Sequence, residues 1–196
     1  MSFAHRNYFN NIAESWNSKF GSDSLCEYLR QFGVAPGDKI MDIGAGTGCI
    51  TQHLNALVEP GGQVVAADIS EKMLWYARGR IQDPRIGFAC ADACALSFRS
   101  GYFDRIICYS TFPHIIRPQA ALSEMYRVLK SHGKLLILHS CCSRELNRFH
   151  AGLNGIVCHD ELPPVEKMLT LVKAAGFNVL HSIEKPDLYW LEVVKS

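Results

Sequence analysis

The sequence predicts a single doubly wound α/β domain, and three observations support this prediction. Short apolar runs alternate along the chain with longer amphipathic stretches, as strands and helices do in this class. The first clear run leads into a turn with glycine at positions 44, 46 and 48, which is typical of a strand, turn and helix that hold a ligand. The last two runs are joined by so short a turn that they must pair antiparallel.

Residues 1–35 precede the first strand and have helical periodicity. Their apolar positions are Tyr8, Phe9, Ile12 and Trp16, followed after Gly21 by Leu25, Tyr28 and Leu29. We therefore expect two amphipathic helices ahead of the sheet.

The next segment contains two strand-helix units. A strand over 39–43 feeds the glycine turn, and apolar residues at helical spacing over 50–58 predict a helix that stops before Pro60. A second buried-type strand over 64–68 ends in a carboxylate, and Ser70 is suited to cap the helix that follows it.

The remaining elements continue the alternation. We expect strands over 86–89, 103–109 and 134–139, and a helix over 118–130 that is ended by Gly133. An irregular region over 140–162 precedes a helix opened by Pro164 and closed by Gly176. The final strands, 177–183 and 188–194, flank a turn at 185–187.

Composition limits the classes of partner. The 196 residues include 20 Lys plus Arg and 19 Asp plus Glu, so a formal net charge of +1 provides no global field for nucleic acid or an anionic membrane. The chain shows neither the apolar run of a signal peptide nor a membrane span, and we expect a cytoplasmic protein. The eight cysteines are expected to be reduced thiols. Oligomeric state is left open.

The strand ends point to a nucleoside-containing ligand. In an open α/β sheet the ligand lies beyond the carboxyl ends of the strands. Asp68 follows Gly48 by twenty residues, the offset of a carboxylate that binds ribose hydroxyls, and Asp92 is placed to reach an adenine. Cys49 replaces the third small residue of the dinucleotide turn, and the acidic Asp42 favours a cationic amino-acid moiety over pyrophosphate.

At this point the chain resembles the class I S-adenosylmethionine-dependent methyltransferases, in particular small-molecule, UbiE-like members. The resemblance covers nearly the whole chain and is carried by five segments: residues 41–48, 67–74, 91–93, 103–107 and 121–130. It implies a Rossmann-like seven-stranded sheet in the order 3-2-1-4-5-7-6 with strand 7 antiparallel. Ser131-His-Gly133 departs from the Pro-Gly-Gly that is common in the family, at a turn away from the cofactor.

The resemblance also implies residue roles. The glycine turn contacts the methionine part of S-adenosylmethionine, Asp68 binds the ribose, Asp92 lies near the adenine, and residues 8–16 form a cap over the cofactor. The expected cofactor-binding residues are Tyr8, Asp42, Gly44, Ala45, Gly46, Asp68, Ile69, Met73, Asp92, Ala93 and Tyr109.

A small-molecule acceptor is expected near the end of the fourth strand. His114 is the candidate base or acceptor contact there, with packing beside Pro113 as the structural alternative. The segment 140–162 is expected to form the acceptor pocket, with a short helix capped by Ser143, and the expected substrate-binding residues are His114, Arg144, His150 and His159. No Cys-x-x-Cys pair accompanies the thiols and imidazoles of this region, so no metal site is predicted.

Two other functions remain open from the sequence. An NAD(P)-dependent oxidoreductase would share the glycine turn and Asp68, although Cys49 disfavours it. A non-catalytic S-adenosylmethionine-binding protein would share the entire cofactor site, because the sequence does not establish turnover.

Overall fold

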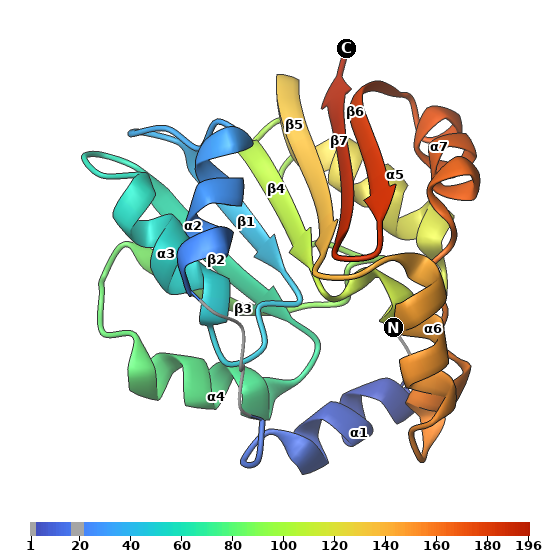
Figure 1. Cartoon of the computed structure of the whole chain (residues 1–196). Coiled ribbons are helices and arrows are strands. Elements are labelled where there is room, and N and C mark those ends of the chain that lie inside the picture. The colour runs from blue at the N-terminus through green and yellow to red at the C-terminus, as the bar shows by residue number, and fades with distance from the viewer. Residues whose placement is uncertain (1–2, 17–21) are drawn as a thin grey trace.

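Seven strands form one sheet in the computed structural model, which describes residues 3–16 and 22–196 (Figure 1). Their order is β3-β2-β1-β4-β5-β7-β6, with β7 antiparallel to both of its neighbours, so the predicted topology is confirmed. The strands are β1 (Lys39–Ile43), β2 (Gln63–Asp68), β3 (Ile86–Cys90), β4 (Phe103–Tyr109), β5 (Leu129–His139), β6 (Phe177–Lys185) and β7 (Leu188–Lys195). The expected break at Gly21 lies outside the described residues.

Helices alternate with these strands along the chain. They are α1 (Phe3–Ile12), α2 (Ser22–Gln31), α3 (Cys49–Leu57), α4 (Glu71–Arg80), α5 (Pro118–Val128), α6 (Ser143–Ala151) and α7 (Val165–Ala174), with short 3-10 turns η1 (Phe112–His114) and η2 (Ile156–His159). The Ser70 hydroxyl accepts a hydrogen bond from the Met73 N–H at 3.1 Å, which confirms the predicted cap of α4.

The central strands of the sheet are covered on both faces, which explains their uninterrupted apolar runs, whereas the edge strand β6 is largely exposed. Successive residues of a strand point to opposite faces. Thus Leu135 joins the core beneath α5 and α7, while Leu136 joins the core beneath α2 and α3. Among the described residues no helix is long and apolar enough to cross a membrane.

Two local predictions are wrong. The helix expected over 118–130 ends at Val128, and β5 already begins at Leu129, so Gly133 lies within β5 rather than at a helix end. A Cβ at Gly133 would lie 2.9 Å from the Lys130 carbonyl oxygen, so glycine serves a close backbone approach. Ser143 does not cap α6, because its hydroxyl donates to Glu184 at 2.6 Å and Cys142 is the N-cap residue.

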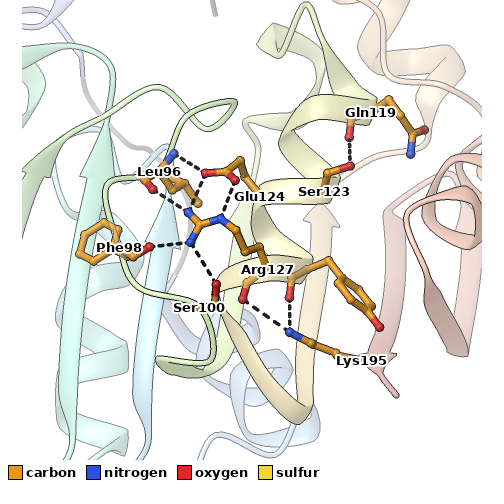
Figure 2. Close-up of polar contacts among 9 residues, drawn as sticks. Leu96, Phe98, Ser100, Gln119, Ser123, Glu124, Arg127 and Lys195 are labelled. Atoms are coloured by element: carbon orange, nitrogen blue, oxygen red, sulfur yellow. Dashed lines mark hydrogen bonds and ion pairs between the residues drawn. The ribbon is translucent and has the colours of Figure 1, made fainter.

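The motif over 121–130 has a structural role away from the strand ends (Figure 2). The Arg127 guanidinium makes charge-assisted hydrogen bonds to both carboxylate oxygens of Glu124, at 2.7 and 2.8 Å. It also donates to the carbonyl oxygens of Leu96 and Phe98, at 2.8 and 2.7 Å. The pair therefore fastens the loop between β3 and β4 onto α5.

The N-terminal helix α1 lies across the carboxyl ends of the strands, between α4 and α6 (Figure 1). Hydrogen bonds of Asn10 and Arg6 fasten it to α4. Ser70 donates its hydroxyl hydrogen to the Asn10 side-chain oxygen at 2.6 Å, and the Arg6 guanidinium donates to Glu71 at 2.8 Å. A helix near the start of the chain thus covers the sheet edge where strand-end side chains gather.

Candidate functional site

A cavity opens beneath α1 at the carboxyl ends of β1, β2 and β4. The space between its walls is about 690 Å³, which includes open solvent at its mouth. Its walls consist of the glycine turn, the ends of three strands and the aromatic residues of the N-terminal segment. The lining residues are Phe9, Trp16, Asp42, Gly44, Ala45, Gly46, Thr47, Cys49, Ile50, Asp68, Met73, Tyr109, Ser110, Thr111 and His114.

The glycine turn is held tightly against neighbouring strands. The backbone N–H groups of Gly44 and Ala45 both donate to the Ala67 carbonyl oxygen, at 2.8 and 3.1 Å. Gly44 has a φ of 73°, and a Cβ there would lie 2.1 Å from the Thr111 hydroxyl oxygen. Only glycine allows both this conformation and this contact. The backbone of the turn therefore packs directly against the Thr111 side chain at the end of β4.

Asp68 connects the turn to the second strand-helix unit. Its carboxylate accepts hydrogen bonds from the backbone N–H groups of Gly46 and Ser70, each at 2.8 Å. Burial raises the pKa of Asp68 to about 6, although these N–H donors oppose the rise. A carboxylate has about four acceptor positions, so Asp68 retains capacity for ligand hydroxyls while its orientation is set by the backbone.

Asp42 places a second carboxylate in the same cavity wall. It is 1% exposed and accepts a hydrogen bond from the Thr51 hydroxyl at 2.6 Å. Burial raises its pKa to about 7, the Thr51 hydrogen bond lowers it, and the neighbouring Asp68 charge raises it further. Two carboxylates with raised pKa values favour a cationic ligand, because a positive charge would offset their desolvation and mutual repulsion.

Aromatic rings close the opposite wall. The Phe9 ring stands edge-on to the imidazole of His114, with centroids 5.0 Å apart, and edge-on to the Trp16 indole at 6.2 Å. Ser110, at the end of β4, has a φ of 50°, a left-handed conformation that is uncommon for a residue other than glycine. His114 follows it on η1, and its side chain lines the cavity.

Asp160 does not line the cavity but contacts His114, which does. One of its carboxylate oxygens accepts a hydrogen bond from Nδ1 of His114 at 2.6 Å, and both oxygens lie within 3.0 Å of Nε2 of His5. The backbone carbonyl oxygen of Asp160 accepts from Nδ1 of His150 at 2.8 Å. Asp160, the residue that follows η2, therefore contacts three imidazoles, one each from α1, η1 and α6.

A fourth histidine, His139, ends β5 below this group. It is 1% exposed, its ring meets Tyr189 edge-on, and neither ring nitrogen has a hydrogen-bond partner among the described residues. Burial lowers its pKa to about 3, with further lowering by His114 and His150. His139 is therefore neutral at physiological pH and adds no charge to the wall.

The structure places eight of the predicted site residues on the cavity wall. They are Asp42, Gly44, Ala45, Gly46, Asp68, Met73, Tyr109 and His114. The other predicted residues lie elsewhere. Tyr8 packs against Gly155, Ala93 belongs to the core, and Asp92 pairs with Arg117 at 3.7 Å beyond β3. Ile69 is half-buried and does not line the cavity; His150 is buried beside His114, whereas Arg144 and His159 are exposed.

Sequence reasoning missed several wall residues. Phe9 and Trp16 were expected only as part of the cap segment 8–16, and Asp160 only as part of the segment 140–162, whereas Thr111 and His5 were not assigned roles. The helical period holds a usable signal for two of them, since His5 and Phe9 are four residues apart and so share a face of α1. The contact between His5 and Asp160 spans 155 positions and has no local signal.

The donor set of the cavity fits a nucleoside with a cationic amino-acid moiety. Among the described residues that line it, two carboxylates are present and no Lys or Arg. This charge pattern opposes a pyrophosphate, which is bound through cations or helix N-termini. Within the described parts of the chain, no three His, Cys, Asp or Glu side chains are arranged to hold a metal ion.

The chain is similar in sequence to known methyltransferases. Residues 41–137 match the methyltransferase domain family. The ubiquinone/menaquinone biosynthesis C-methyltransferase UbiE of Ectopseudomonas mendocina is 38% identical over 110 residues, which cover 54% of this chain and 43% of that protein. The chain spans about half the length of the curated relatives it matches.

Solved structures share the fold. A SAM-dependent methyltransferase from Aquifex aeolicus superposes with a TM-score of 0.74 at 20% identity, covering 88% of this chain and 89% of that one. Phosphoethanolamine N-methyltransferase 2 of Haemonchus contortus, in complex with phosphomonomethylethanolamine and S-adenosylhomocysteine, superposes with a TM-score of 0.72 at 26% identity. It covers 92% of this chain, which matches 46% of that protein.

Proposed function

The chain belongs to the class I S-adenosylmethionine-dependent methyltransferases, and we propose that it transfers the methyl group of this cofactor to a small-molecule acceptor. The observation that carries the proposal is the cavity at the carboxyl ends of β1, β2 and β4. It combines the glycine turn, the buried carboxylates Asp42 and Asp68, and the imidazole of His114 in one wall.

The cofactor roles follow from the positions of these groups. Asp68 is oriented by two backbone donors to accept hydrogen bonds from ribose hydroxyls. Asp42 faces the amino-acid moiety, whose positive charge would offset its raised pKa. Ile69, Asp92 and Ala93 lie at the ends of β2 and β3, where the resemblance places the adenine. A Haemonchus contortus phosphoethanolamine N-methyltransferase with a similar fold is named in complex with S-adenosyl-L-methionine, which supports the choice of cofactor.

The chain's own contribution to chemistry is positioning, exclusion of water and handling of a proton. When bound, S-adenosylmethionine supplies an electrophilic methyl group on a sulfonium. Phe9 and Trp16 cover the cavity and limit the access of water. His114 is the candidate base or acceptor contact.

The charge of the cavity bears on the acceptor. Lys and Arg are absent from its lining in the described chain, so a phosphorylated acceptor such as that bound by the Haemonchus contortus enzyme is disfavoured. The aromatic wall favours a small, uncharged or cationic acceptor. We take residues 1–35 as the cap and 140–162 as the acceptor-pocket insertion, because α1 covers the cavity and Asp160 supports His114.

Binding and turnover test the proposal together. Isothermal titration with S-adenosylmethionine, S-adenosylhomocysteine and NAD should give binding of the first two ligands only. Radiolabelled methyl transfer to a panel of thiols, amines, phenols and metalloids should be lost in Asp68→Ala. NAD binding alone would indicate the oxidoreductase, and tight cofactor binding without transfer to any acceptor would indicate a non-catalytic binding protein.

A further inference from the structure

We propose that Asp160 is a positioning residue that orients His114 toward the cavity and couples this orientation to the seating of α1 through His5. The inference rests on the proposed function, in which His114 faces the acceptor. It adds a residue outside the cavity lining and a link between the cap and the proton acceptor.

The hydrogen bond between His114 and Asp160 selects a tautomer. An ionised carboxylate only accepts hydrogen bonds, so Nδ1 of His114 must carry the hydrogen in the 2.6 Å contact. The neutral ring then has its lone pair on Nε2, which has no hydrogen-bond partner among residues 3–16 and 22–196. Because the ring lines the cavity, Nε2 is the nitrogen available to an acceptor.

The same carboxylate holds the cap. Nε2 of His5 lies 2.9 and 3.0 Å from the two oxygens of Asp160, and both residues are buried. Phe9, one turn further along α1, covers the His114 ring. When α1 packs over the strand ends, it therefore brings His5 to Asp160 and Phe9 to His114 together.

Other titratable groups near the carboxylate do not replace it. Burial alone would raise the pKa of Asp160, but hydrogen bonds from His114 and then His5 outweigh burial and lower it. The other neighbours are His150 on α6 and His139 on β5, whose pKa values are lowered mainly by burial. Asp160 is thus the acidic group in contact with His114, and the lowered pKa values of His139 and His150 favour the neutral forms of these two imidazoles.

The hydrogen bond between His114 and Asp160 indicates which class of acceptor the site suits. In the proposed step, Nε2 of His114 takes the proton of an acceptor N–H, O–H or S–H group while that atom bonds to the methyl carbon. The electron pair of the broken carbon–sulfur bond stays on sulfur, and the new imidazolium charge is balanced by Asp160. The site therefore suits a protic acceptor that must lose its proton rather than a preformed anion.

Nitrogen-15 NMR of labelled protein tests the tautomer without any substitution. The imidazole signals of His114, assigned by their loss in His114→Gln, should show hydrogen on Nδ1 in the neutral ring. A neutral ring with hydrogen on Nε2 would overturn the proposal. This measurement needs neither cofactor binding nor turnover, so its outcome is distinct from the fate of the proposed function.

The tautomer reported by the same signals tests the coupling in variants. Asp160→Asn should lower the fraction of neutral His114 rings that carry hydrogen on Nδ1, because an amide side chain can donate a hydrogen bond as well as accept one. His5→Phe should also lower this fraction, because the carboxylate then loses the contact that α1 makes with it. Arg6→Gln is the matched control, since it removes the exposed link from the same helix to Glu71 and should leave the fraction unchanged.

Two results would contradict the proposal. An unchanged tautomer fraction in Asp160→Asn would remove the positioning role. Equal changes in His5→Phe and Arg6→Gln would reduce the cap contact to general packing. If Asp160→Asn does not fold, the difference between His5→Phe and Arg6→Gln still decides the coupling.

Discussion

Gly44 and Thr111 meet where the glycine turn touches the end of β4, and the Thr111 hydroxyl donates to the Gly44 carbonyl oxygen at 3.2 Å. A Cβ at position 44 would lie 2.1 Å from the Thr111 hydroxyl oxygen and 2.6 Å from its Cβ. The first glycine of the turn is thus required by the protein's own packing as well as by its backbone conformation.

Gly44→Ala should destabilise the protein by about 2–4 kcal/mol and abolish cofactor binding, because clash and backbone strain act together. Thr111→Ala should not rescue it, since the Cβ of residue 111 remains, whereas Thr111→Gly should restore part of the stability. Urea unfolding of the single and double variants measures this. Equal rescue by both changes would show that the hydroxyl and methyl groups alone cause the clash.

Asp42→Asn should stabilise the ligand-free protein at pH 8 while abolishing cofactor binding. Burial raises the pKa of Asp42 from 3.8 to about 7, so the folded state binds more protons than the unfolded state between these values. Stability from this group therefore falls as pH rises through that window. We expect a gain of about 1–4 kcal/mol above pH 7 and almost none below pH 4, measured by denaturant unfolding; a gain independent of pH would contradict this.

Cofactor affinity of the wild-type protein should fall as pH decreases from 8 to 5. The raised pKa values, about 7 for Asp42 and about 6 for Asp68, mean that both carboxylates take up protons in this range. A cationic ligand must displace those protons, so binding at pH 6 should release protons. Titration calorimetry in buffers of different ionisation enthalpy measures the release, and pH-independent affinity would indicate that neither carboxylate faces the cation.

His114→Gln should retain cofactor affinity within about threefold and lose about 10²–10⁴-fold in turnover, the usual range for a general base. Gln keeps much of the side-chain volume but accepts no proton at neutral pH. The control is His181→Gln, on the exposed face of β6. Parallel measurement of binding, thermal unfolding and methyl transfer separates the roles, because unfolding of the variant would mark His114 as a packing residue.

Arg127→Met should lower stability by about 2–4 kcal/mol with little change in cofactor affinity. The substitution leaves the carbonyl oxygens of Leu96 and Phe98 and the Glu124 carboxylate without their shared donor (Figure 2). The effect is local to the loop between β3 and β4. Thermal unfolding and calorimetry with S-adenosylhomocysteine measure it, and a loss of affinity larger than the loss of stability would tie this loop to the cavity.

Local patterns in the sequence specify most of the architecture. The strand-end carboxylates Asp42 and Asp68 were predictable because the carboxyl ends of parallel strands meet at one edge. The cap of α4 at Ser70 was predictable because an N-cap depends on neighbouring residues alone. The end of α5 was not, because Gly133 serves the close approach of two carbonyl oxygens, those of Lys130 at 2.9 Å and Asp104 at 3.1 Å from its would-be Cβ, and Asp104 lies on the neighbouring strand β4.

The tertiary structure decides which side chains share the cavity wall. Periodicity constrains residues within about two turns of helix or one strand, whereas His5 and Asp160 are 155 positions apart and meet only when α1 folds over the sheet. His114 was identified from its strand-end position, but its hydrogen-bond partner was not. Local spacing therefore specifies the element order and the strand-end carboxylates, while the surroundings of His114 depend on burial and long-range packing.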